Sequence, residues 1–332
     1  MKKFLNDPKN FVDEMLEGIL AAHPDQLSTA GELRSIVRAQ KENKVSLMSG
    51  GGSGHLPLFM GYVGDGMLDG CAIGGVFQSP SPEQILKVTK AIDCGKGVLY
   101  VYGNYTGDIM NFEMSSELAE TDNIKTSHIL GADDVASAPK GEENKRRGVA
   151  GIFYVFKTAG AAAKEGADLE AVKKVAQKAA ANVRTIGVAL SPCTIPEIGT
   201  PSFNIGEDEM EIGMGIHGEP GIARTKLENA DSVVSKMMEQ ILADMPLKQN
   251  DEISVLINGL GATPKEELYI VYRKVNALIK KTGAKVFNVY VGEFATSMEM
   301  SGFSISVFKL DGELKTYLAK PARSPFFEQR QL

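Results

Sequence analysis

The spacing of apolar residues constrains the fold of this chain most. Short apolar runs alternate along the sequence with longer stretches in which apolar residues recur at helical spacing. This alternation is typical of α/β folds, whose sheets are largely buried. The runs that we expect to be strands are 45–48, 97–102, 126–130, 185–191, 253–258, 285–291 and 303–309. The stretches that we expect to be helices are 10–21, 83–93, 108–120, 149–165, 169–183, 227–244 and 265–281.

The length of 332 residues suffices for two domains or for one large α/β unit. A polar stretch at 193–212 separates the first set of strands from the last, so we place a domain boundary near residue 184. The segment 131–148, "GADDVASAPKGEENKRRG", is polar and punctuated by glycine and proline. It is expected at the surface, either as a solvated loop or as a cover over a site.

Charge and cysteine content exclude several classes of protein. The formal net charge is -6 and the longest basic run is Lys145-Arg146-Arg147, which argues against direct nucleic-acid binding. The three cysteines lie far apart, so neither a disulfide framework nor a zinc site is indicated. Without a signal peptide or a long apolar run, we expect a cytoplasmic protein that does not enter a membrane.

The first candidate site is the glycine-rich stretch "SGGGSGH", Ser49 to His55, directly after the expected strand 45–48. Glycine amides at a strand-to-loop junction can approach an anion or a small polar ligand closely. The stretch lacks the Gly-Lys-Ser/Thr ending of a nucleotide P-loop, and it does not meet the dinucleotide-binding pattern. A tight turn without a ligand is the alternative.

The second candidate is Asp108 in "GNYTGDIMNFE", which again follows an apolar strand. Asp108 is either the N-cap of a helix over 109–120 or a carboxylate that faces a crevice. Together with His55 on a neighbouring strand end, it could exchange protons with a hydroxyl substrate. By contrast, Ser79 or Ser81, before the helix at 83–93, is explained by helix capping alone.

The third candidate is His217 in "MGIHGEPG", one of only four histidines. Gly215, Gly218 and Gly221 are expected to leave its ring uncrowded, and Glu219 could orient one ring nitrogen. A neutral imidazole held in this way is a competent nucleophile toward a carbonyl carbon. From the residues alone, His217 is a nucleophile, a proton carrier or a structural histidine.

Taken together and in this order, these motifs resemble the DhaK family, the dihydroxyacetone-binding subunits of dihydroxyacetone kinases. The resemblance implies two α/β domains, each a sheet with flanking helices, here 1–184 and 185–332, and a homodimer. It further implies that no cofactor is bound, because the nucleotide belongs to a separate subunit. The motifs that carry it are "NDPKNFVDEMLEG", "SGGGSGH", "SPSPEQ", "NYTGDIMNFE", "RRGVAG", "GVALSPCTIP", "EIGMGIHGEPGI", "NGLGATPKEELY" and "TSMEMSGFSISVFKLD".

The resemblance also assigns roles to single residues. It implies that His217 forms a covalent hemiaminal with the carbonyl carbon of dihydroxyacetone. It implies that the glycine-rich stretch contacts a substrate hydroxyl through Gly52 and Ser53, and that His55 and Asp108 bind or activate the hydroxyl to be phosphorylated. Only a carbonyl compound can form the hemiaminal, so glycerol would be rejected because it has no electrophilic carbon.

Three departures from the family pattern lead to a specific expectation. Leu56 stands where kinase members commonly have glutamate, Leu58-Phe59 replaces a small residue and a histidine, and Gly103 replaces lysine. Loss of that lysine should weaken phosphoryl transfer more than carbonyl capture, and an apolar rim would suit a different partner. We therefore expect a ligand-sensing coactivator like the family's paralogue DhaQ, which binds dihydroxyacetone and then a TetR-like transcription factor. The alternative is a kinase subunit that works with a separate nucleotide-bearing subunit.

Overall fold

The computed structural model describes residues 2–332 and divides into two compact units. The first unit comprises the chain up to Gly131 together with Phe153–Ala180 and Leu314–Leu332, and the second comprises Ala132–Ile152 and Ala181–Glu313. Each unit holds a six-stranded sheet with helices, which confirms the expected fold class. The division differs from a single boundary near residue 184, because the chain passes between the two units more than once.

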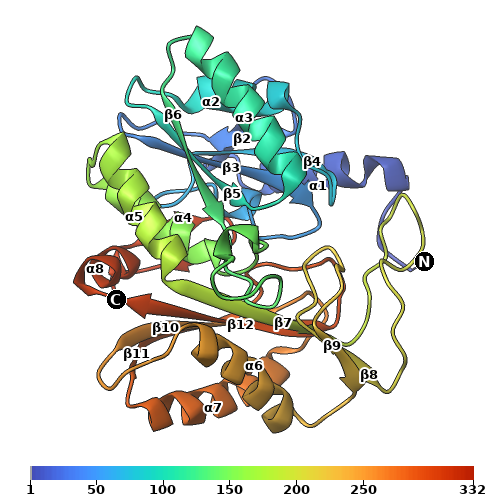
Figure 1. Cartoon of the computed structure of the whole chain (residues 1–332). Helices are drawn as coiled ribbons and strands as arrows, with labels where there is room; N and C mark the ends of the chain where they lie inside the picture. Colours follow the sequence, from blue (N-terminus) through green and yellow to red (C-terminus); the bar gives the residue numbers. More distant parts are fainter. Residues whose placement is uncertain (1) are drawn as a thin grey trace. The chain divides into compact units, whose positions relative to one another are not determined.

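The sheet of the first unit has the strand order β1-β2-β4-β3-β5-β6. Its strands β3 to β6 run parallel to one another, β2 pairs antiparallel with β4, and β1 pairs antiparallel with β2 at the edge. The helices α2 (Pro82–Ile92) and α3 (Thr106–Thr121) lie over one face of this sheet (Figure 1). The strands are β1 (Leu27–Thr29), β2 (Ser35–Arg38), β3 (Ser46–Ser53), β4 (Gly70–Val76), β5 (Val98–Gly103) and β6 (Thr126–Gly131).

Aromatic and aliphatic side chains fill the layer between this sheet and its two helices. The rings of Tyr102 on β5 and Phe112 on α3 stack with centroids 4.1 Å apart. At the start of α2, the Ser81 hydroxyl accepts the backbone N–H of Gln84, and the Gln84 side chain accepts the N–H of Ser81. This reciprocal capping confirms the structural role expected for Ser81.

The remaining elements of the first unit include the end of the chain. The hydroxyl of Ser324 donates to the carbonyl of Gly61 at 2.7 Å, and the Arg323 N–H donates to the Asp65 carbonyl at 2.9 Å. These bonds explain why residues far apart in the sequence belong to one unit. The elements concerned are α1 (Phe11–Ala22), α4 (Ile152–Lys164), α5 (Leu169–Ala181), α8 (Gly312–Ala319), β13 (Ala322–Ser324) and β14 (Phe327–Gln329).

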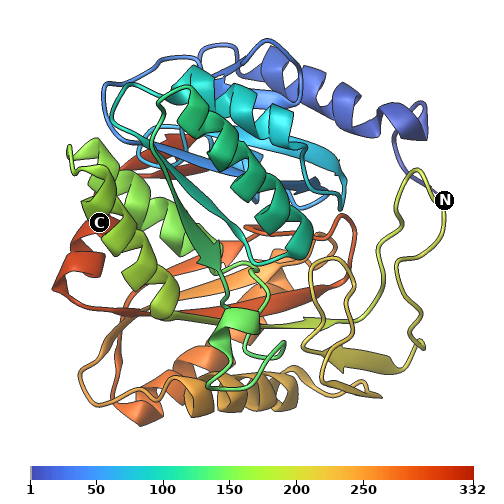
Figure 2. The same ribbon diagram turned by 45° about the horizontal axis from the view of Figure 1, so that its top comes forward.

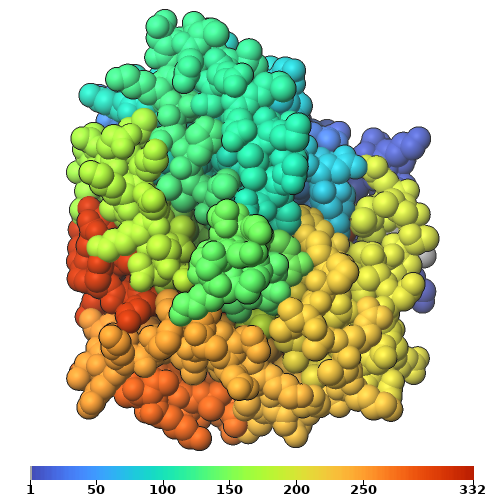
Figure 3. Space-filling view, viewed as in Figure 1, coloured from blue at the N-terminus to red at the C-terminus, as the bar shows by residue number. Residues whose placement is uncertain are grey.

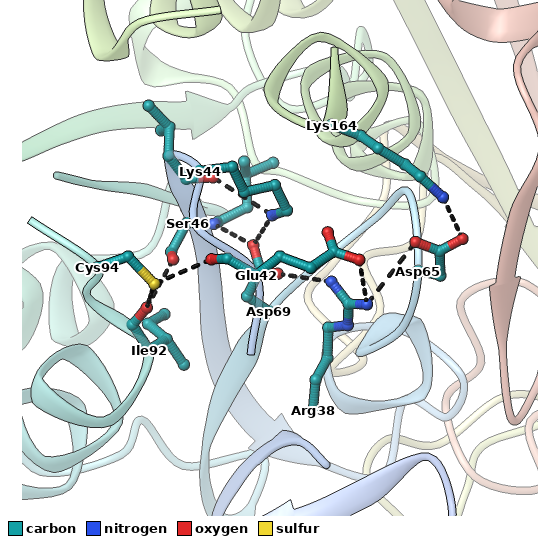
Figure 4. Close-up of polar contacts among 11 residues, drawn as sticks. Arg38, Glu42, Lys44, Ser46, Asp65, Asp69, Ile92, Cys94 and Lys164 are labelled. Carbon is teal, nitrogen blue, oxygen red and sulfur yellow. Dashed lines mark hydrogen bonds and ion pairs between the residues drawn. The ribbon is translucent and has the colours of Figure 1, made fainter. Parts of the chain in front are cut away.

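A buried network of charges lies beside the start of β3 and β4 (Figure 4). The carboxylate of Asp69 accepts from Lys44 Nζ at 2.5 Å, from Arg38 Nη1 at 3.1 Å and from the Leu47 N–H at 2.9 Å. Arg38 also pairs with Glu42, and this bond lowers the Glu42 pKa although burial opposes the shift. A carboxylate removed from water is tolerated because it is fully paired in this way.

The sheet of the second unit has the order β11-β10-β12-β7-β8-β9, and only β10 and β11 pair in parallel. The helices α6 (Ala230–Asp244) and α7 (Lys265–Thr282) run along one face of it (Figures 1 and 2). Between them lies a core of buried aliphatic and methionine side chains. The strands are β7 (Val183–Ala189), β8 (Glu209–Ile212), β9 (Ala223–Lys226), β10 (Glu252–Gly259), β11 (Lys285–Gly292) and β12 (Gly302–Leu310).

Every strand and helix expected from the sequence is present, with ends that shift by a few residues. The elements that the apolar pattern missed are mostly strands of three or four residues, too short to show a period. The longer β4, "GCAIGGV", was missed because its three glycines interrupt the apolar run. Within residues 2–332, no helix is both long enough and apolar enough to span a bilayer.

Candidate functional site

Residues 49–53 of the glycine-rich stretch belong to a strand and not to the loop that the sequence predicted, and only Gly54 and His55 lie beyond it. β3 continues to Ser53, so the glycines pair with β4, with a shift of register between Gly51 and Ser53. A Cβ on Gly51 would lie 2.4 Å from the Phe59 ring, and one on Gly52 would lie 2.7 Å from the backbone of Phe77. The missing side chains therefore allow neighbouring segments to pack directly against the end of β3.

Ser53 and His55 follow at the carboxyl end of β3. The hydroxyl of Ser53 donates to the Gly74 carbonyl at 3.0 Å, so its proton is engaged within the unit. The imidazole of His55 is 1% exposed and stacks on Phe77 with ring centroids 4.8 Å apart, while Phe59 meets its edge. Both phenylalanines have positive φ, 57° for Phe77 and 66° for Phe59, a strained conformation that is often found at functional sites.

Of the departures next to His55, Leu58 and Phe59 do not form an apolar rim. Leu58 is 3% exposed and Phe59 is 6% exposed, and together with Met15 and Cys71 they line a small cavity. The expectation that this pair offers a partner surface is therefore wrong. Leu58 and Phe59 instead pack inside the first unit, where the ring of Phe59 occupies the space beside Gly51.

Asp108 lies in the first turn of α3 and is not its N-cap. The helix begins at Thr106 after Tyr105, which makes no side-chain capping bond. At 6% exposure the Asp108 carboxylate is buried at the positive end of the helix dipole. β3 and β5 are adjacent and parallel, so their carboxyl ends, which lead to His55 and to Asp108, meet at one edge of the sheet as expected. Gly103 is the last residue of β5 and is buried.

In the second unit, His217 lies in the loop that joins β8 to β9, two strands that pair antiparallel. Its Nδ1 is 2.9 Å from Glu219 Oε1, and its backbone N–H donates to Glu219 Oε2 at 2.9 Å. The side chain of His217 is 23% exposed. The orienting role expected for Glu219 matches this geometry, and the His217 side chain remains partly exposed.

The charge of Glu219 decides which ring nitrogen of His217 carries the proton. Burial by itself raises the pKa of Glu219, but the hydrogen bond and charge of His217, with the charge of Arg147, lower it to about 2. Glu219 is thus an ionised acceptor near neutral pH, so the proton of a neutral imidazole lies on Nδ1. Nε2 then carries the lone pair and is the ring nitrogen that can act as a nucleophile.

Arg147 is a functional candidate that sequence reasoning missed. Its Nη1 lies 4.0 Å from Glu219 Oε2, its Nε donates to Asp134 at 2.9 Å, and its Nη2 donates to the Gly213 carbonyl at 2.8 Å. A Cβ on Gly215 would lie 2.1 Å from Glu219 Oε2. This glycine makes room for the Glu219 carboxylate and Arg147, and not for the imidazole as we expected. In the sequence, Arg147 stands out only as part of the motif "RRGVAG". That motif does not predict that Arg147 lies beside Glu219.

The segment 131–148 is anchored at both ends and exposed at its tip. Arg146 is 1% exposed and forms two hydrogen bonds with Asp244, the last residue of α6. Residues 139–143 are largely exposed on the face seen in Figure 3. The segment therefore delivers Arg147 to the His217 loop and is more than a solvated connection. Within residues 2–332, no group of His, Cys, Asp and Glu side chains forms a metal site.

Comparisons with known proteins agree with these motifs over almost the whole chain. Residues 17–326 match the family model described as the Dak1 domain. The chain is 47% identical over 331 residues to "PTS-dependent dihydroxyacetone kinase 2, dihydroxyacetone-binding subunit DhaK" of Listeria innocua, with 99% of each chain covered. It is 37% identical to "PEP-dependent dihydroxyacetone kinase, dihydroxyacetone-binding subunit DhaK" of Escherichia coli, with 98% of each chain covered.

A solved structure from the coactivator branch is also similar. "Dihydroxyacetone kinase operon co-activator Dha-DhaQ" superposes with a TM-score of 0.87 at 34% identity, and 93% of this chain and 96% of that chain are covered. The resemblance expected from the motifs is confirmed, and identity to the Listeria kinase subunit exceeds identity to the co-activator. This chain therefore belongs to the Dak1 domain family.

Proposed function

We propose that this chain is the dihydroxyacetone-binding subunit of a dihydroxyacetone kinase and that His217 holds the ligand covalently. The observation that carries the proposal is the pair formed by His217 and Glu219, in a chain whose relatives are named as dihydroxyacetone-binding subunits. Glu219 keeps the proton on Nδ1 and leaves the Nε2 lone pair for the carbonyl carbon. The ligand itself needs no metal or organic cofactor for this step.

The proposed capture step balances as follows. The bond between Nε2 and the carbonyl carbon forms while the π pair moves to the carbonyl oxygen, which takes up a proton. The imidazole then carries a substituent on Nε2 and a proton on Nδ1, so it is positively charged until Nδ1 releases that proton. The ionised Glu219 stabilises this cation across the 2.9 Å hydrogen bond. The net result is transfer of one proton from nitrogen to oxygen.

For the first unit we propose the roles that the resemblance implies. Gly52 and Ser53 contact ligand hydroxyls, and His55 and Asp108 bind or activate the hydroxyl that receives the phosphoryl group. The burial of His55 and Asp108 supports this proposal, since proton exchange is more effective where water is excluded. The phosphoryl group comes from a separate nucleotide-bearing subunit, and the chain works as a homodimer in the cytoplasm.

A second candidate function is the ligand-sensing coactivator, which would pass capture of dihydroxyacetone to a TetR-like transcription factor. The similarity to the co-activator structure and the glycine at position 103 favour it. The burial of Leu58 and Phe59 removes one of its supports, because these side chains offer no surface to a regulator. We therefore place the kinase subunit first.

The deciding experiment mixes the chain with dihydroxyacetone, a nucleotide-bearing kinase subunit and its phosphoryl donor. We expect dihydroxyacetone phosphate from the wild-type chain and a covalent adduct by intact mass in the absence of the partner. His217→Ala should lose the adduct, whereas Asp108→Asn should keep the adduct and lose phosphoryl transfer. An adduct that persists in His217→Ala would refute the anchor, and an adduct without any phosphoryl transfer would favour the coactivator.

A further inference from the structure

The outer face of α3 carries an exposed apolar stripe. Met110, Met114 and Leu118 are 61%, 51% and 39% exposed, and their spacing of four residues places them along one side of the helix. The inner face buries Phe112 and Ala119 against the sheet, so the stripe is not needed for the core. Figure 3 shows α3, in blue-green, on the visible surface of the molecule.

A row of carboxylates borders the stripe. Glu113, Glu117 and Glu120 follow each other at helical spacing along one edge of it, and all three are exposed. Within residues 2–332 none of the three forms an ion pair, and α3 contains no lysine or arginine. The exposed face of α3 is therefore apolar on one side and negatively charged on the other.

The carboxylates near the C-terminal end of α3 oppose the stability of the helix. Carboxylates near a helix C-terminus are unfavourable because the dipole is negative there, yet Glu117 and Glu120 lie in the last turns. In contrast, α7 begins with Glu266 and Glu267 and ends with Lys280 and Lys281, as the dipole favours. A local rule broken without a structural gain is typical of a functional surface.

We propose that the outer face of α3 is the docking surface for the phosphoryl-donating subunit, which meets it with an apolar ridge bordered by lysine or arginine side chains. The proposal rests on the proposed function, since only a kinase subunit requires such a partner. Three observations support it. The stripe is accessible, the unpaired carboxylates call for positive charge on the partner, and methionines adapt readily to a partner surface. Asp108 lies in the first turn of the same helix, so docking along α3 brings the partner to the buried carboxylate.

The test measures the affinity of the ADP-loaded nucleotide-bearing subunit for three variants by titration calorimetry. The first variant replaces Met110, Met114 and Leu118 with serine, and the second replaces Glu113, Glu117 and Glu120 with glutamine. The control carries Tyr269→Ser and Ile270→Ser, which removes apolar side chains of α7 that are 58% and 49% exposed. Intact mass after addition of dihydroxyacetone monitors the ligand anchor in each case.

We expect the serine variant to lose affinity by about ten-fold or more, as for the central residues of an interface. The glutamine variant should lose affinity several-fold at low salt and lose most of its salt dependence. Its melting temperature should be unchanged or higher, because the carboxylates oppose the helix dipole. A loss of binding without a loss of stability excludes a folding defect.

Failure of this inference can be told from failure of the proposed function. If the wild-type chain binds the subunit and supports phosphoryl transfer, but the two α3 variants bind equally well, the docking surface is wrong and the function stands. An equal loss of binding in the α7 control would also refute the assignment to α3. If the wild-type chain forms the adduct yet neither binds the subunit nor supports transfer, the proposed function fails and the docking surface fails with it.

Discussion

Glu219 holds His217 at two points, through Nδ1 of the ring and through the backbone N–H, each at 2.9 Å. The first bond sets the tautomer and the second sets the position of the loop. Because the two residues are separated by a single glycine, the arrangement is built almost entirely from local sequence. The most direct predictions concern this pair.

Glu219→Gln should slow adduct formation by about ten-fold or more, because an amide cannot enforce a proton on Nδ1 or stabilise the imidazolium cation. The rate is measured by intact mass at a series of dihydroxyacetone concentrations. The variant keeps the shape of the side chain, so the melting temperature should change little. An unchanged rate would show that the tautomer of His217 does not depend on Glu219.

Arg147→Ala should also slow adduct formation, and Arg147→Lys should restore part of the rate. Arg147 helps to keep the pKa of Glu219 low, so its loss should raise that pKa. The acid limb of the pH–rate profile should then shift to higher pH. A purely structural role would lower the stability without moving the profile. Arg224→Ala is the matched control, because Arg224 lies in β9 of the same hairpin but pairs with Glu211.

Asp69→Ala should lower the free energy of unfolding by about 3–5 kcal/mol, because it leaves the buried Lys44 and Arg38 without their shared partner. Denaturant titration measures the change. The exposed pair of Lys90 and Asp122 provides the comparison, and Asp122→Ala should change stability by about 1 kcal/mol or less. Equal losses of stability in the two variants would contradict the claim that burial makes the Asp69 ion pairs more costly to break.

The burial of Lys157 makes the free energy of unfolding depend on pH above about pH 7. Its side chain is fully buried and donates to the Tyr317 carbonyl at 3.1 Å, and burial lowers its pKa to about 7. Between that value and the ordinary lysine pKa of about 10.4, the unfolded chain binds a proton that the folded chain does not, so stability rises with pH. Below about pH 7 both states are protonated and the cost of burying the charge is fully present.

Lys157→Met should therefore stabilise the protein near neutral pH by a few kcal/mol. It should also weaken the dependence of the free energy of unfolding on pH between about pH 7 and 10. Chemical denaturation at several pH values measures this difference against the wild-type chain. Lys174→Met on the exposed side of α5 is the control and should follow the wild-type slope. Parallel slopes for wild type and Lys157→Met would show that Lys157 stays charged when folded.

The sequence by itself determined the strands and helices that are long and periodic, the α/β class and the family. It also located His217 beside its orienting carboxylate, because His217 and Glu219 are neighbours in the chain and their contact needs no tertiary information. The apolar period is a local property, so β10 or α7 could be recognised from a single stretch.

Only the tertiary structure decided the rest. It showed that the glycines at 50–52 belong to a strand whose neighbours fill the space of the absent side chains. Phe59 reaches Gly51 only because the chain turns back after β3, and the apolar pattern does not predict that turn. It buried Leu58 and Phe59, and it brought Arg147 to Glu219 across a long separation in the chain. Such contacts depend on how distant segments pack, and a periodic pattern carries no information about that packing.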